Sequence, residues 1–121
     1  MKSPPLNTTF ASMSKALKKL EWLVIIYDKP INQRLKFRPT HFQAIPKSFE
    51  NGTVTSAGPV FKDDERTQFA GSAFTIAAEK KSDIIDFLKQ DVYAKEGVWD
   101  FDNIVIHPYT PVVRAQKDFP K

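Results

Sequence analysis

The segment that most limits the possible folds is residues 21–28, which read EWLVIIYD. This near-continuous run of aromatic and β-branched residues is typical of a central strand that is buried on both faces. Lys29 and Pro30 follow the run, and proline cannot donate the hydrogen bond that a central strand requires. The chain is therefore expected to build a sheet around this strand.

Three further strands and two helices are predicted from the rest of the pattern. Apolar segments bounded by turn residues predict strands at residues 53–61, 69–78 and 101–109, with a charged hairpin loop at residues 62–66. Apolar stripes at helical spacing predict helices at residues 40–50 and 83–90. This order matches the split βαβ pattern of ferredoxin-like domains. We expect an α+β fold, βαββαβ, in which two helices cover one face of a four-stranded antiparallel sheet.

The other face of that sheet has no cover within the chain. Apolar runs such as residues 22–27 contribute side chains to both faces of a sheet, and two helices hide only one of them. A large uncovered apolar face is typical of an interface. We therefore expect a homodimer through the open sheet face.

Prolines and polar residues set the expected helix bounds. Pro39 is expected to be the first residue of the first helix, because proline disfavours helical geometry in the preceding Arg38 but fits a helix start. Pro46 should then kink that helix. Ser82 is expected to cap the second helix. Residues 91–99 are interpreted as a connector.

Composition bounds the class of protein. A length of 121 residues with 41% hydrophobic content fits one domain, which we place at residues 21–113, before a C-terminal tail at residues 114–121. No apolar run approaches the ~20 residues needed to cross a bilayer, so a soluble protein without a membrane partner is expected. The absence of cysteine excludes thiolate chemistry, and two histidines argue against a His-rich metal site. We expect neither a metal nor another cofactor.

The N-terminal residues 1–20 carry the excess positive charge. Four lysines and no acid occur there, whereas the remaining 14 basic residues balance 14 acidic ones. A nucleic-acid partner is therefore not expected. The segment is rich in Ser and Thr and resembles a weak mitochondrial presequence, but it lacks arginine. A disordered tail that leads into a short helix is the alternative, so we expect a cytoplasmic protein, with a mitochondrial one as the second possibility.

Several short motifs follow one another in an order that resembles a known family. Residues 34–41, RLKFRPTH, resemble the signature R-x-x-x-R-P-x-H, and residues 56–59, SAGP, resemble T-A-G-P. GS at 71–72, DVY at 91–93 with GV at 97–98, and HPY at 107–109 fall at the positions of G-S, D-P-Y…G-V and K-P-F. Together, over residues 21–113, these motifs resemble the YciI-like (YCII-related domain) family. Val92 in place of the proline of D-P-Y, and Pro46, depart from the family pattern.

This resemblance implies a dimeric α/β barrel, in which two sheets pack face to face. It also implies a cleft in each subunit, built around a histidine and an aspartate, and His41 and Asp91 occupy those positions. A few relatives of the fold act on hydroxylated aromatic or lactone compounds, for example by dehydrochlorination or isomerisation.

His41 and Asp91 are the candidate catalytic residues. If Pro39 begins the helix, His41 lies in its first turn, where the helix dipole disfavours the imidazolium form. A neutral imidazole can accept a proton, and Asp91 would orient the ring by accepting its other N–H. The alternative is that His41 only caps the helix or packs locally.

The remaining candidates are expected to bind substrate. Arg34 and Arg38 would grip a carboxylate or phenolate with both guanidinium nitrogens, unless they form surface ion pairs. A further set comprises two hydroxyl donors, a glycine that admits a ligand to the backbone, and an aromatic wall residue: Ser56, Ser72, Gly58 and Tyr93. Core packing is the alternative for Tyr93.

Two functions follow from these candidates. In the first, the chain is an enzyme in which His41 and Asp91 perform acid-base chemistry, as in an elimination, an isomerisation or a lactone-type reaction, on a small anionic cyclic or aromatic compound. In the second, the same cleft belongs to a non-catalytic binding or accessory module. Turnover of a bound compound separates the two.

Overall fold

The computed structural model describes residues 19–120. Its elements are β1 (Leu20–Asp28), α2 (Arg34–Glu50), β2 (Val54–Phe61), β3 (Phe69–Ala78), α3 (Lys81–Lys89), α4 (Val92–Lys95) and β4 (Trp99–Tyr109). The segment predicted at residues 1–20 lies outside the described range except for its last two residues. None of the helices between residues 19 and 120 combines the length and the apolar character that crossing a membrane requires.

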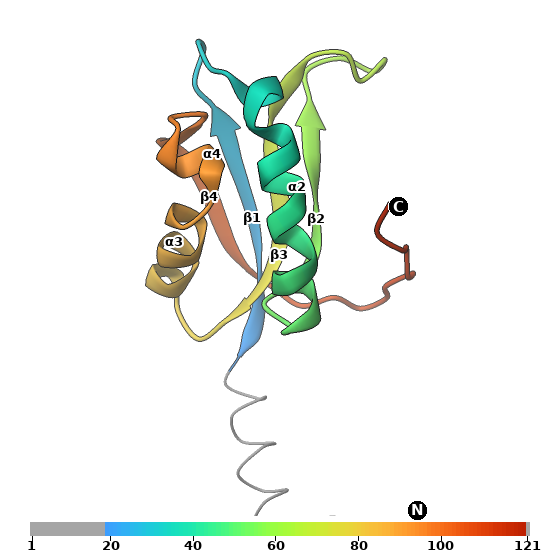
Figure 1. Cartoon of the computed structure of the whole chain (residues 1–121). Helices are drawn as coiled ribbons and strands as arrows, with labels where there is room; N and C mark the ends of the chain where they lie inside the picture. Colours follow the sequence, from blue (N-terminus) through green and yellow to red (C-terminus); the bar gives the residue numbers. More distant parts are fainter. Residues whose placement is uncertain (1–18, 121) are drawn as a thin grey trace, which may run out of the picture.

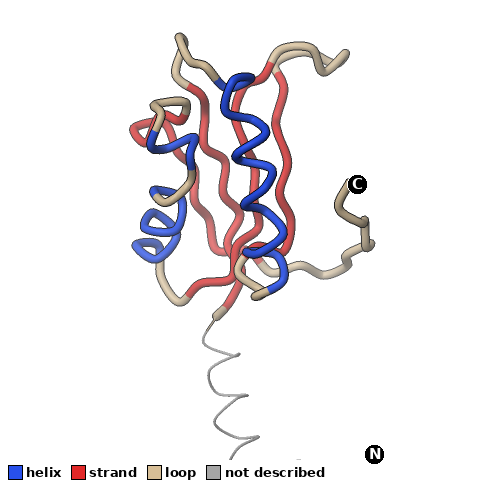
Figure 2. The backbone as a smooth tube through the Cα atoms, in the orientation of Figure 1, coloured by secondary structure: helices blue, strands red, loops and turns tan. Residues whose placement is uncertain are grey.

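The four strands form one antiparallel sheet in the order β2-β3-β1-β4 (Figure 1). The apolar strand β1 is central, as its sequence predicted, and pairs with both β3 and β4. Helix α2 and the α3–α4 segment lie on the same side of the sheet (Figure 2). The predicted α+β ferredoxin-like fold is therefore confirmed.

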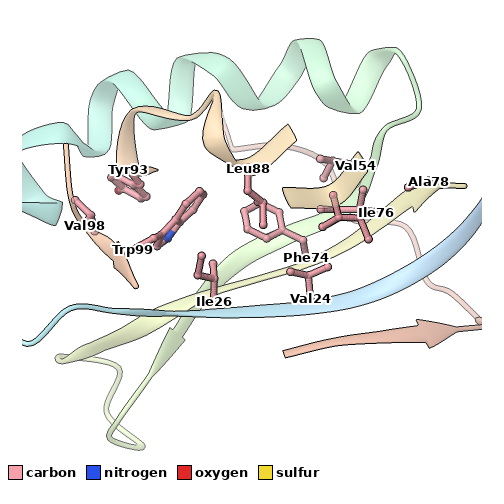
Figure 3. Close-up of a cluster of buried hydrophobic side chains, with 11 residues drawn as sticks. Val24, Ile26, Val54, Phe74, Ile76, Ala78, Leu88, Tyr93, Val98 and Trp99 are labelled. Carbon is pink, nitrogen blue, oxygen red and sulfur yellow. The ribbon is translucent and has the colours of Figure 1, made fainter. Parts of the chain in front are cut away.

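The core lies between the helices and the sheet. Val24 and Ile26 of β1 are fully buried there, and Phe74 and Ile76 of β3 belong to the same cluster (Figure 3). Leu88 of α3 packs onto the same cluster. Because alternate strand residues point to opposite faces, the intervening side chains of β1 point to the open face, where they are half-buried: Leu23, Ile25 and Tyr27.

Helix α2 begins at Arg34, five residues earlier than predicted. The Asn32 side chain accepts a hydrogen bond from the Arg34 N–H, and the Arg34 guanidinium binds Asp28, so the first turn is held from β1. These contacts outweigh the local preferences of Arg38 and Pro39, and the helix also continues past Pro46 to Glu50. The predicted helix start at Pro39 was wrong. His41 is the eighth helical residue, about two turns from the start, so the dipole argument for its protonation does not apply.

The segment between α3 and β4 contains an element that the sequence analysis missed. Asp91 caps the short helix α4, because its side chain accepts a hydrogen bond from the Tyr93 N–H at 2.9 Å.

The predicted cap of α3 was wrong, since that helix begins at Lys81 and Ser82 lies within its first turn. The cap at Asp91 fixes the direction of its carboxylate, which matters for the site below.

The chain after β4 crosses the end of the open face and returns toward α2. Arg114 donates hydrogen bonds to Glu21, which also accepts one from Thr55. Burial raises the pKa of the Glu21 carboxyl, but these two partners outweigh burial and leave that pKa below its ordinary value. Further along, the Phe119 ring lies 5.5 Å from the Phe42 ring of α2.

Gly71 is required where β3 pairs with the end of β1. A methyl group at this position would lie 2.2 Å from the Ile26 carbonyl oxygen, whereas nothing lies within 4 Å of the same position at Gly58. We predict that Gly71→Ala lowers the free energy of unfolding by about 1–3 kcal/mol, because the strands must separate. Gly58→Ala is the control and should change it by less than about 0.5 kcal/mol. Equal losses of unfolding free energy in Gly71→Ala and Gly58→Ala, measured by chemical denaturation, would contradict this interpretation.

Candidate functional site

The site is centred on His41, which points from α2 toward α4. Its Nδ1 lies 2.9 Å from each carboxylate oxygen of Asp91. Because Asp91 is also the cap of α4, its carboxylate is held in place by the Tyr93 N–H. The structure thus brings together the two residues that the sequence analysis singled out as catalytic candidates.

This contact fixes the roles of the two ring nitrogens. A carboxylate accepts hydrogen bonds, so in the neutral ring Nδ1 carries the proton and Nε2 keeps its lone pair. Within residues 19–120, no hydrogen bond involves Nε2, and the buried side-chain nitrogen without a partner is Nε of Arg34. Nε2 is therefore not fully enclosed, and in the neutral ring it can accept a proton from a ligand.

Two aromatic side chains hold the imidazole ring. The Tyr93 ring stacks on it with centroids 4.1 Å apart and an interplanar angle of 13°. Trp99 meets it edge-on at 5.9 Å and 86°. Both are 1% exposed, so Tyr93 supports the histidine as part of the core and does not line the pocket, which corrects its predicted role. Burial raises the pKa of the Tyr93 phenol, which favours its neutral form.

Arg34 is a buried structural residue, contrary to its predicted role in gripping a ligand. Its Nη1 binds both oxygens of Asp28 at 2.9 and 3.1 Å, and its Nη2 donates to Ser72 Oγ at 3.0 Å. Its guanidinium carbon lies 4.7 Å from the Phe69 ring centroid and 4.8 Å from that of Tyr93. Arg34 also borders a second pocket, of about 470 Å³, together with Asp28, Lys62 and Phe69, but both of its Nη atoms are bonded within the protein and its Nε is enclosed.

Ser72 connects this buried ion pair to the aromatic residues around the histidine. Its hydroxyl oxygen accepts from Arg34 and also from Trp99 Nε1, at 3.2 Å. Ser72 is 1% exposed, so it cannot reach a ligand in the groove, and its predicted role as a ligand donor is corrected in the same way. The ion pair, Ser72 and Trp99 form a buried polar support behind His41.

A groove of about 290 Å³ runs between α2 and α3, with β2 and β3 as its floor. Its size suits a small organic compound. It is lined by His41, Ala44, Ile45, Lys47, Ser48, Asn51, Thr53, Val54, Ala57, Phe74, Phe87, Leu88, Gln90 and Asp91. The catalytic candidates thus meet a concave surface with an apolar middle and polar ends. Among residues 19–120, no three potential ligands cluster to hold a metal ion.

Three other candidates lie outside this groove. Ser56 pairs with Thr75, and Gly58 with Ala73, so both belong to the open face of the sheet, opposite to Phe74 and the groove. Both predicted placements were wrong because a register shift between Val54 and Ser56 changes the alternation of β2. Arg38 is exposed and is not among the lining residues, and its guanidinium lies 4.5 Å from the Phe42 ring centroid.

The groove residues on α2 were missed although the helix predicted at residues 40–50 contains most of them. Ile45, Ser48 and Asn51 follow His41 at intervals of three or four, which places them on its face of the helix. That spacing was the available signal. Lys47 and Gln90 had no comparable signal, since a lone exposed polar residue is common on any helix.

Comparison with known proteins finds relatives that this chain matches over different shares of their length. The chain is 34% identical over 101 residues to the Aspercryptin biosynthesis cluster protein B of Emericella nidulans, an alignment that covers 78% of this chain and spans 65% of the relative. It is 29% identical to Fusaric acid biosynthesis protein 2 of Gibberella moniliformis, over 74% of this chain and 91% of that protein. It matches an aspartate kinase of Fusarium oxysporum f. sp. lycopersici over 18% of that protein's length, at 28% identity. No family model matches the chain.

A solved structure with a similar fold is the 5-chloro-2-hydroxyhydroquinone dehydrochlorinase from Burkholderia phenoliruptrix, in complex with 2,5-dihydroxybenzoquinone. Its TM-score is 0.54 at 18% sequence identity, and the match covers 75% of this chain and 94% of that one. At this identity the similarity supports the fold alone.

The buried ion pair yields a prediction about stability and pH. Burial raises the pKa of the Asp28 carboxyl, and Arg34 opposes that rise. We expect Arg34→Met to lower the free energy of unfolding by about 3–5 kcal/mol near pH 7, because it leaves a buried carboxylate unpaired. Without Arg34 the folded-state pKa of Asp28 rises further, so the loss should shrink as the pH falls and the carboxyl takes up a proton.

Arg38→Met is the matched control, since Arg38 is exposed. Its effect should stay within about 0.5 kcal/mol at every pH. Urea denaturation of the three proteins between about pH 5 and pH 8 measures the difference. A loss in Arg34→Met that grows as the pH falls would contradict the assigned ion pair.

Proposed function

We propose that this chain is a YciI-like enzyme in which His41 acts as a general base and then as a general acid on a small ligand in the groove. The observation that supports this most is the contact between His41 Nδ1 and Asp91, at 2.9 Å, at the wall of that groove. A carboxylate that fixes the tautomer and orientation of an imidazole is the arrangement that general-base histidines use.

The proposed step transfers one proton. Nε2 takes a proton from a carbon or hydroxyl of the ligand, and the electron pair left behind forms an enolate or phenolate. In an isomerisation the imidazolium returns the proton at another atom. In an elimination the electron pair expels an anionic leaving group, and the imidazolium releases its proton to water. Asp91 stabilises the imidazolium in both cases without itself taking up the proton.

The names of the relatives are in keeping with chemistry on small molecules. Two of them are described as proteins of aspercryptin and fusaric acid biosynthesis, and the similar structure is that of a dehydrochlorinase bound to a quinone. We therefore propose a small cyclic or aromatic compound that carries a negative charge as the substrate.

A second candidate function is a binding module without turnover. The groove by itself favours it, because a cavity with an apolar middle binds ligands whether or not chemistry follows. Such a module would be stabilised thermally by a ligand that mass spectrometry recovers unchanged. Recovery of a converted compound excludes this candidate.

Substitutions at the pair test the catalytic proposal. The protein is incubated with a panel of small cyclic anions, including chlorinated hydroxyhydroquinones and hydroxylated lactones, and products are followed by mass spectrometry. We expect conversion by the wild-type protein and a decrease in rate of about 100-fold or more in His41→Ala. Full activity in His41→Ala would overturn the base assignment.

Asp91→Asn separates the charge of Asp91 from its structural role. Asparagine caps a helix about as well as aspartate does, so α4 should persist and the melting temperature should stay close to that of the wild type. Turnover should still fall, because the amide can present an N–H to Nδ1 and favour the wrong tautomer. Wild-type turnover in this variant would contradict the orienting role.

We further propose that two chains pair through the open sheet face. The half-buried Leu23, Ile25 and Tyr27 of β1 are flanked there by Ala73 of β3 and Val105 of β4. These side chains form an apolar surface that the helices cannot cover, because α2 and α3 lie on the opposite face.

A charge at the centre of this surface should separate the subunits. We expect the wild-type protein to sediment as a dimer and Ile25→Glu to sediment as a monomer at the same micromolar concentration, because a buried unpaired carboxylate is costly at an interface. Asp102→Ala, at an exposed position of β4, is the control and should remain dimeric. A wild-type monomer at high concentration would contradict the pairing.

A further inference from the structure

We infer that the groove takes an elongated anion, with its charged group at Lys47 and its uncharged, reactive end at His41. The identity of the reactive end rests on the proposed function, whereas the binding orientation does not. The substrate class becomes an aromatic or alicyclic ring that carries an acidic side arm.

The two arginines that seemed suited to an anion are not available in the groove. Arg34 is committed to Asp28 and Ser72, and Arg38 lies over the Phe42 ring. Among the groove-lining residues Lys47 is the one cation, and it takes part in no ion pair within residues 19–120.

The charges in the groove are arranged along its length. Asp91 lies at the His41 end, bound to Nδ1. Lys47 is six residues further along α2, which corresponds to about 9 Å along the helix axis. An anionic group is repelled by the Asp91 carboxylate and attracted by the Lys47 ammonium, so an elongated anion enters in one orientation. Its neutral end then faces Nε2.

The polar residues near Lys47 suit a carboxylate. Asn51 is the residue that caps the end of α2, four positions after Lys47, and lines the same groove. Its Oδ1 accepts the Thr53 N–H, so its amide N–H groups remain as donors within the described part of the chain. A carboxylate at this end would receive an ammonium and an amide donor.

The middle of the groove suits a ring. Ile45, Val54, Phe74 and Phe87 supply apolar surface between the two polar ends. A phenolate gripped beside His41 would leave this surface unused and would place its charge next to Asp91. The geometry therefore favours a ligand whose charge is separated from the atom that loses the proton.

Binding of two matched probes tests this orientation without any need for turnover. Hydrocinnamate and its neutral primary amide are titrated into the full-length protein at low ionic strength and followed by NMR. We expect the acid to bind the wild type about fivefold more tightly than the amide, the size of an exposed ion pair. Lys47→Met should reduce this ratio to about one, Lys47→Arg should keep it, and Arg38→Met should leave it unchanged.

The site of the carboxylate gives a second readout. Intermolecular NOEs should place the probe's chain carbon beside the carboxylate near Lys47 and its ring near Phe74. The inference would be overturned if the affinity ratio is unaffected by Lys47→Met or is lost in Arg38→Met. It would also be overturned by NOEs from that chain carbon to His41, or if neither probe binds.

His41→Ala distinguishes this inference from the proposed function. The preference for the acid should survive in His41→Ala, because that substitution leaves Lys47 and the apolar floor in place. If the preference holds but no compound is ever converted, the catalytic proposal fails and the binding orientation stands. If turnover depends on His41 but Lys47→Met keeps the preference for the acid, the binding orientation fails and the catalytic proposal stands.

Discussion

The hydrogen bond between His41 and Asp91 joins two parts of the chain that no other side-chain hydrogen bond or ion pair in the described residues connects. Asp91 ends the loop after α3 and caps α4, while His41 lies two turns into α2. The Asp91 carboxylate therefore caps α4, selects the tautomer of the neutral His41 ring and lines one end of the groove. A position that serves three purposes tolerates few substitutions, and Asn preserves the cap alone.

The support behind this contact comes from the sheet. Asp28 at the end of β1 holds Arg34, which reaches Ser72 of β3, and Ser72 in turn accepts from Trp99 at the start of β4. Trp99 and Tyr93 then fix the imidazole ring between them. Together these contacts connect β1, β3, β4, α2 and α4 around the His41 ring and so fix the position of Nε2. This preorganisation is what a general base requires, because it holds Nε2 toward the groove before a ligand arrives.

The sequence predicted the sheet well, because hydrophobic patterning in residues 21–28 and 69–78 has few alternative solutions. It predicted the start of α2 poorly, because the ion pair of Arg34 with Asp28 overrides the local preference of Pro39 and involves residues that are not adjacent. The same reason explains why Arg34 and Ser72 were assigned to a ligand: a motif shows that a charge is present but not whether a buried partner neutralises it. The proximity of His41 and Asp91 was anticipated from family resemblance, whereas the groove beside them follows from the spacing of α2 and α3 in the folded chain.

The most direct test of the central claim is the protonation pattern of the His41 ring, measured by two-bond nitrogen–proton NMR correlations. The chain has two histidines, and the signals that disappear in His41→Ala identify the His41 ring. At about pH 8, where an ordinary imidazole is neutral, the structure predicts a proton on Nδ1 of His41, a bare Nε2, and an Nδ1 proton that Asp91→Asn displaces. A proton on Nε2 of His41, or an Nδ1 proton that Asp91→Asn leaves unchanged, would contradict it.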